Sequence, residues 1–87
     1  MSEYFRHVDG GYYRREGVAK SSEDLSAWVV YEHVWPFERG MWIRPQAEWF
    51  SRFTPVSEAE VVVALGGVRE QAQAAVARAK AARRLQG

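Results

Sequence analysis

Apolar and polar positions in the first two thirds of the chain alternate in short runs separated by glycine and proline, a pattern typical of strands and turns. The runs are rich in aromatic and β-branched residues, which favour extended structure. They predict strands near residues 12–20, 28–34, 40–44 and 52–55, with turns over residues 21–24 and 36–40. Residues 28–34 are apolar at both alternating positions, which indicates a central strand covered on both faces.

The last third of the chain is rich in alanine, arginine, glutamine and glutamate, which favour helix. Ser57 and Glu60 have the spacing of a capping box, in which the serine hydroxyl and the glutamate carboxylate each accept a free backbone N–H. We therefore expect a helix to begin at Glu58. Earlier in the chain, Pro45 occupies a favourable first helical position and predicts a single helical turn over residues 45–50.

Apolar residues of the C-terminal segment recur at alternating steps of four and three, the spacing of a coiled-coil seam. Gly66 and Gly67 interrupt this seam, so a kink or break and one continuous helix remain open alternatives. An alanine-rich helix is marginally stable alone and requires a partner, either its own domain or a second copy of itself. A continuous helix from Glu58 to Gln86 would extend beyond the aromatic domain, so we expect a homo-oligomer, most simply a dimer, formed through this helix. The predicted seam consists of Val61, Leu65, Val68, Ala72, Ala75, Ala79 and Ala82.

These elements together predict an α+β fold. We expect residues 1–56 to form an aromatic-rich, SH3-like antiparallel β-barrel or a curled sheet. Residues 57–87 are expected to form an alanine-rich C-terminal helix that belongs to the same structural unit.

Composition narrows the possible functions. The 87 residues contain no cysteine, which excludes disulfides and thiolate metal sites. No apolar run approaches the roughly 20 residues of a membrane-spanning helix, and the N-terminus lacks the order of a signal peptide, so we expect a cytoplasmic protein without a membrane partner. No phosphate-loop motif or metal-ligand cluster is present in the sequence, and we expect no cofactor or metal.

Charge is divided unevenly along the chain, although its formal total is only +1. Residues 1–67 carry seven Lys and Arg against ten Asp and Glu, a net charge of −3, whereas residues 68–87 carry five against one, a net charge of +4. Only the helix is then positioned to contact phosphates, so sequence-specific binding of nucleic acid is not expected.

Residues spread over positions 4–54 form a recognisable pattern. The chain contains Phe5-Arg6-His7, Gly10-Gly11, Tyr13, Gly17-Val18-Ala19-Lys20, Ser22-Glu23, Val29-Val30-Tyr31, Gly40-Met41-Trp42-Ile43-Arg44-Pro45 and Phe50. In these residues it resembles the domain of unknown function 1653 family of short bacterial and phage proteins. The resemblance implies a small β-rich domain and assigns no activity. The chain departs from the family pattern at Trp35-Pro36, at Trp49 and in its C-terminal helix.

Five residues from separate predicted elements form the candidate site: Arg6, His7, Tyr31, Trp42 and Arg44. Arginine binds phosphate or carboxylate through paired hydrogen bonds, and an aromatic face stacks on a base. We therefore expect Arg6 and Arg44 to converge on an anionic, nucleotide-like ligand. The alternative is structural, with the arginines bound to carbonyls or to Glu32 and the aromatic residues forming the core.

Three classes of function remain open. The first is a non-enzymatic module that binds a small anionic, nucleotide-derived ligand, and the resemblance to phage proteins adds a role in sequestering a host signal. The second is a nucleic-acid or protein interaction module, which predicts Arg14, Arg15 and the basic helix on one face. An enzyme is third, because catalysis would require a second titratable group beside His7 or Glu32.

Overall fold

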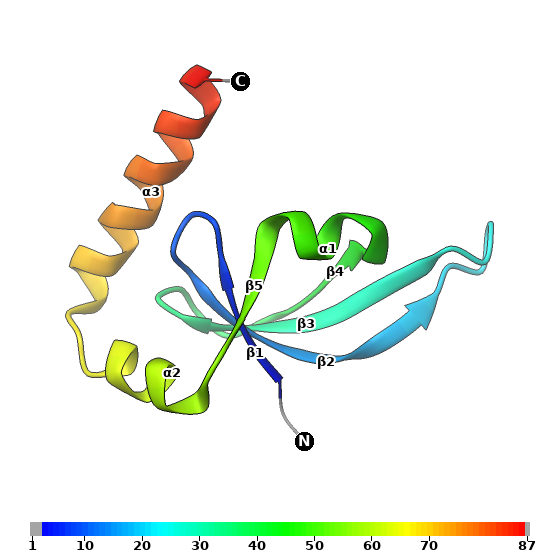
Figure 1. The fold of residues 1–87 in the computed structure, drawn as a ribbon, viewed down its shortest axis with the longest axis horizontal. Helices are drawn as coiled ribbons and strands as arrows, with labels where there is room; N and C mark the ends of the chain where they lie inside the picture. The colour runs from blue at the N-terminus through cyan, green and yellow to red at the C-terminus, as the bar shows by residue number, and fades with distance from the viewer. Residues whose placement is uncertain (1–2, 87) are drawn as a thin grey trace.

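The computed structural model describes residues 3–86, which form five strands and three helices (Figure 1). The elements are β1 (Glu3–His7), β2 (Tyr12–Lys20), β3 (Ala27–Trp35), β4 (Met41–Pro45), α1 (Gln46–Arg52), β5 (Phe53–Val56), α2 (Glu58–Leu65) and α3 (Arg69–Gln86). The four predicted strands are confirmed as β2 to β5. β1 was not predicted, because Phe5 is the one apolar residue among its inward positions Glu3, Phe5 and His7, so the strand shows no apolar alternation.

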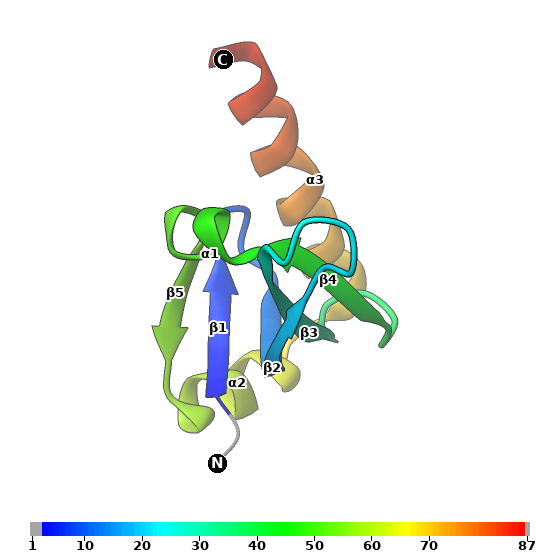
Figure 2. The ribbon, with the colours of Figure 1, turned by 90° about the vertical axis from the view of Figure 1, so that its right-hand side faces the viewer.

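The strands form one antiparallel sheet in the order β4-β3-β2-β1-β5 (Figure 2). β4 and β5 are its two edges, so the curled sheet is the form adopted and the closed barrel is not. The register of β2 against β3 shifts between Tyr12 and Tyr13 and again between Arg15 and Gly17. Such irregularities bend a strand and increase its twist, which accounts for the curl.

Strand register places one set of side chains on the same face of the sheet, called here the inner face. Partners across the ladders include Phe5 with Tyr13, Tyr13 with His33, and Tyr31 with Trp42. Successive residues of a strand point to opposite faces, so Arg6 and Tyr12 lie on the other side. The inner face includes Phe5, His7, Tyr13, Arg15, Val29, Tyr31, His33, Trp42, Arg44 and Phe53.

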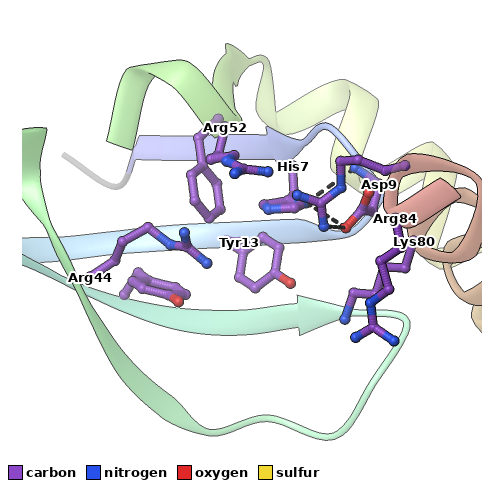
Figure 3. A pocket seen from close by; sticks show the side chains of 10 residues that line it. His7, Asp9, Tyr13, Arg44, Arg52, Lys80 and Arg84 are labelled. Carbon is purple, nitrogen blue, oxygen red and sulfur yellow. Dashed lines mark hydrogen bonds and ion pairs between the residues drawn. The ribbon is translucent and has the colours of Figure 1, made fainter. Parts of the chain in front are cut away.

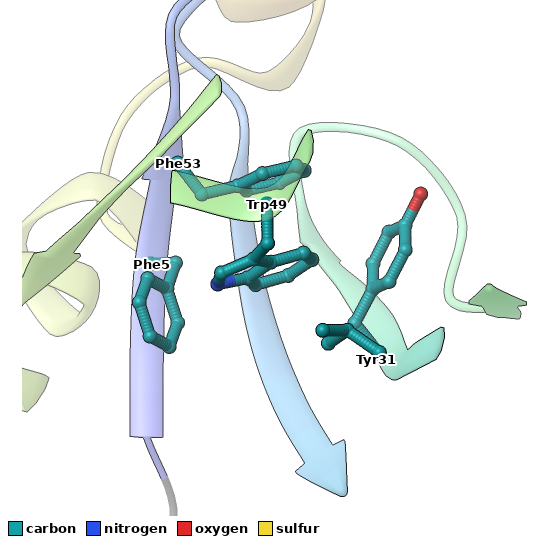
Figure 4. Packing of buried hydrophobic residues seen from close by; sticks show 5 residues of the cluster. Phe5, Tyr31, Trp49 and Phe53 are labelled. Atoms are coloured by element: carbon teal, nitrogen blue, oxygen red, sulfur yellow. The ribbon is translucent and has the colours of Figure 1, made fainter. Parts of the chain in front are cut away.

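α1 covers part of the inner face and closes the hydrophobic core (Figure 4). Trp49 of α1 is fully buried, stacks on Phe53 with ring centroids 3.9 Å apart, and meets the edge of Phe5 at 5.2 Å. Val29 and Tyr31 complete the cluster from β3. α1 spans seven residues and is longer than the single turn that the proline predicted.

α2 begins at Glu58 as predicted, and the hydroxyl of Ser57 accepts the backbone N–H of Glu60 at 3.1 Å. The reciprocal half of the capping box is not formed. The Glu60 carboxylate accepts the hydroxyl of Tyr12 instead, at 2.9 Å. This contact joins α2 to the face of the sheet opposite the core.

The predicted C-terminal helix is interrupted at Gly66-Gly67. α3 is a separate helix that runs in a different direction from α2 (Figure 1). Val76 of α3 is buried next to Gly10, and Gln73 donates to the carbonyl oxygen of Pro36 at 2.9 Å. None of the helices within residues 3–86 is long and apolar enough to cross a membrane.

The predicted seam is only partly correct. Val61 is buried, but Leu65 and Val68 are 44% and 58% exposed, and the most buried residue of α3 is Val76, which the seam did not include. The break at the two glycines changes the direction of the helix, so a single period cannot continue through it. Ala72, Ala75 and Ala79 line a groove against the protein's own β1–β2 turn.

Candidate functional site

A cavity of about 280 Å³ lies at the end of the inner face, between the sheet, the end of α1 and the side of α3 (Figure 3). Five basic side chains line it, and Asp9 is the one carboxylate of this lining. We call it the cationic cavity. Its lining residues are His7, Asp9, Tyr13, Tyr31, Arg44, Arg52, Phe53, Lys80, Arg83 and Arg84.

Arg44 lines this cavity from the sheet. It is half-buried on β4, and its guanidinium carbon lies 5.6 Å from the centre of the Phe53 ring. Its Nε is buried without a hydrogen-bond partner, and no carboxylate within residues 3–86 forms an ion pair with it. Unpaired polar groups are unfavourable in a protein interior, and a guanidinium binds anions through paired hydrogen bonds. Arg44 is therefore suited to bind an anionic ligand.

His7 and Asp9 form the wall where β1 ends. The backbone N–H of Asp9 donates to Nδ1 of His7 at 3.1 Å, which leaves the proton of neutral His7 on Nε2. Burial lowers the pKa of His7, the Asp9 carboxylate opposes this shift, and the cations Arg44, Arg83 and Lys80 add to it. Asp9 itself is bound by Arg83, whose Nη2 lies 2.8 Å from Oδ2. The charge of the one carboxylate in the lining is thus balanced by Arg83.

Tyr13 adds a hydroxyl donor to the cavity. Burial raises the pKa of Tyr13 to about 12, with Tyr31 adding to the shift and Arg44 opposing it. The hydroxyl therefore stays protonated at neutral pH. Within residues 3–86, no three His, Asp or Glu side chains cluster as ligands of a metal ion would.

A second cavity, of about 430 Å³, adjoins the first and is called here the aromatic cavity. Both cavities are lined by Tyr13, Tyr31, Arg44 and Lys80, so they form two parts of one concave surface. The aromatic cavity adds His33 from β3, Trp42 from β4, and Phe37 and Glu38 from the loop between these strands.

The structure brings together four of the five predicted site residues. Arg44 and Tyr31 line both cavities, His7 lines the cationic cavity and Trp42 lines the aromatic one. Arg6 lines neither, because it points to the opposite face of β1 from His7. The predicted convergence of Arg6 and Arg44 is therefore wrong.

The alternative role considered for Glu32 is also corrected. Glu32 pairs with Arg39, whose Nη1 lies 3.2 Å from Oε1, and forms an ion pair with neither Arg6 nor Arg44 among the described residues.

Sequence reasoning missed most of the cations in the site. The net charge of +4 on residues 68–87 pointed to the cations of α3. Basic residues are also common at the C-terminal end of a solvent-exposed helix, so this charge did not by itself indicate a binding site. The turn at Gly66-Gly67 brings α3 back to the β1–β2 turn, where Val76 lies next to Gly10 and Arg83 binds Asp9. The missed cations are Arg52, Lys80, Arg83 and Arg84.

Comparison with known proteins agrees with the resemblance seen in the sequence. The model of the family described as "Protein of unknown function (DUF1653)" matches residues 3–61. No curated protein and no solved structure matched the chain. The matched segment includes Arg44 and Arg52 but ends before α3, which supplies the other three cations of the cavity. Since the match spans more than half of its length, the chain belongs to the DUF1653 family of proteins of unknown function.

Proposed function

We propose that this protein is a non-enzymatic binding module that holds a small anionic, nucleotide-derived ligand in the cationic cavity. The observation that carries the proposal is the half-buried Arg44, whose Nε has no partner and whose guanidinium faces a cavity with four further cations. Phosphate groups carry several acceptor oxygens and match such a set of donors. A module that binds without turnover would act by sequestering its ligand.

The titratable groups of the site favour binding over chemistry. Burial keeps His7 neutral at physiological pH and Tyr13 protonated, so each offers a hydrogen-bond donor to an anion. A general base would need a carboxylate or an unprotonated histidine nitrogen with access to the ligand. Nδ1 of His7 already accepts the backbone N–H of Asp9. Asp9 is held by Arg83, and its side chain is only 3% exposed.

The alternative of a nucleic-acid interaction module receives less support. That function requires a continuous basic face that includes Arg14, Arg15 and the helix. Arg14 bonds Glu16 at 2.6 Å, and Arg15 bonds Glu3. As neighbours on β2 the two arginines point to opposite faces of the sheet. Of the cations of α3, Lys80, Arg83 and Arg84 line the cavity instead.

Calorimetric titration with inorganic pyrophosphate tests the proposal, because pyrophosphate presents the anionic group alone. We expect the Arg44→Gln variant to bind about 10- to 100-fold more weakly than the unmodified protein, as loss of a charge-assisted hydrogen bond predicts. Arg6→Gln is the matched control, since it removes the same charge from the other face of the sheet. Absence of pyrophosphate binding at millimolar concentration, or equal weakening by the two variants, would contradict the proposal.

A further inference from the structure

We infer that the aromatic cavity binds the base of the nucleotide and reads an N–H group on its edge through Nε2 of His33. This inference rests on the proposed function, because it assigns the second half of a ligand whose phosphates occupy the cationic cavity. It specifies the ligand as a nucleotide bound with its base toward β4 and its phosphates toward α3.

Charge sets the orientation of the ligand across the two cavities. Arg52, Arg83 and Arg84 line only the cationic cavity, whereas the one acidic residue that lines only the aromatic cavity is Glu38. Phosphates are therefore favoured at the cationic end, and a neutral ring at the other. Arg44 lies at the junction and lines both cavities, so its guanidinium can bind phosphate next to the ring-binding surface.

The aromatic cavity supplies surfaces on which a planar ring can stack. Trp42 points from β4 onto the inner face and is 59% exposed, although its strand partner Tyr31 is buried. Phe37, on the loop after β3, also lines this cavity, and its ring lies 5.2 Å from that of His33. Stacking of a base on aromatic side chains is a common mode of nucleotide recognition, and it depends little on which base is bound.

His33 supplies the specific contact. The residue is more than nine-tenths buried, and its Nε2 has no hydrogen-bond partner. Burial lowers the pKa of His33, and a hydrogen bond to the backbone of Trp35 opposes this shift. The ring is therefore neutral at pH 7. A hydrogen bond that raises the pKa of a histidine is one that the ring donates, so we place the proton on Nδ1, and Nε2 is left as an acceptor.

His33 lines the aromatic cavity, and an unpartnered acceptor favours a ligand that brings a donor to it. Exocyclic amino groups and ring N–H groups are the donors at the edges of nucleobases. Tyr13 and Phe37 hold the His33 ring in place, with centroids 4.4 and 5.2 Å away. The acceptor is thus fixed before the ligand arrives, which reduces the entropic cost of binding.

The test compares inorganic pyrophosphate with the diphosphates of adenosine, guanosine, cytidine and uridine at one ionic strength. We expect at least one nucleoside diphosphate to bind tenfold or more tightly than pyrophosphate. Trp42→Ala should remove this advantage and leave pyrophosphate affinity unchanged. Met41→Ala is the control, because Met41 is equally exposed on the same strand but faces the other side.

His33→Phe tests the hydrogen bond, because it keeps a ring in the core and removes the acceptor. We expect it to lower the affinity for the preferred nucleoside diphosphate at least fivefold without changing that for pyrophosphate. Equal binding of pyrophosphate and all four nucleoside diphosphates would overturn this inference while leaving the proposed function intact. Failure of pyrophosphate and nucleotides alike to bind would overturn both.

Discussion

Arg83 Nη2 lies 2.8 Å from Oδ2 of Asp9, and this contact joins two residues 74 positions apart in the chain. The Asp9 side chain is only 3% exposed, whereas that of Arg83 is 42% exposed. The pair therefore attaches a partly solvated helix to a buried carboxylate at the turn after β1. It also places α3 so that Lys80 and Arg84 face the cationic cavity (Figure 3).

Loss of this pair should loosen α3. In the Arg83→Ala variant we expect amide hydrogen exchange over residues 72–80 to accelerate about 5- to 30-fold, corresponding to roughly 1–2 kcal/mol for a charge-assisted hydrogen bond. Arg78→Ala removes the same charge from an exposed position of α3 that lines neither cavity, and it serves as the control. Equal exchange in both variants would mean that Val76 and Gln73 suffice to hold the helix.

The cations of α3 should contribute to ligand affinity although they lie outside the matched family domain. We expect Lys80→Ala combined with Arg84→Ala to weaken pyrophosphate binding about three- to tenfold, because exposed charges contribute modestly. The control is Lys20→Ala combined with Arg78→Ala, which removes two positive charges elsewhere. If both double variants bind equally well, the anion is held by the sheet alone.

Stability should fall below neutral pH because of the two histidines. Burial lowers the pKa of His7 and of His33 below the ordinary value of 6.5, so the unfolded chain takes up protons first as the pH decreases. The stabilising contribution is complete above about pH 6.5 and is lost as the pH falls toward the pKa values of the folded state. Urea unfolding should therefore show a lower midpoint at pH 5.5 than at pH 7.5.

Variants identify the groups responsible for this pH dependence. His7→Gln and His33→Phe should each reduce the difference in midpoint between the two pH values, whatever they do to stability at pH 7.5. An unchanged difference in both variants would assign the pH dependence to carboxylates.

Self-association remains a prediction, and the structure changes where we expect the interface. The alanine residues of α3 lie along a groove against their own domain, while Val62, Val63 and Val68 are 60%, 78% and 58% exposed. Val62 and Val63 are adjacent on α2, and neighbouring exposed apolar residues are typical of an interaction surface. We expect light scattering at micromolar concentration to show a dimer that Val63→Glu dissociates.

Val18→Glu, at a 54% exposed position of β2, is the control for that experiment. Dissociation by Ala75→Glu rather than Val63→Glu would assign the interface to the alanine face. A monomer of 10.0 kDa for the unmodified protein would show that the prediction of a dimer is wrong.

Local interactions allowed much of the fold to be predicted from the sequence. The strands β2 to β5 follow from alternation and turn residues within a few positions, and the start of α2 follows from a hydroxyl three residues from the N–H that it caps. The inner-face placement of Tyr31, Trp42 and Arg44 depends on period-two alternation along neighbouring strands.

Tertiary structure decided the features that depend on distant segments. Alternation along a strand places Arg6 and His7 on opposite sides of the sheet. This could be used only once residues 3–7 were known to form a strand, which their pairing with β2 and β5 shows. The break at Gly66-Gly67 determined which face of α3 is buried and brought Arg83 to Asp9. Sequence periodicity describes one continuous element, whereas this site is formed where the direction of the chain changes, so its cationic half became visible only in the folded protein.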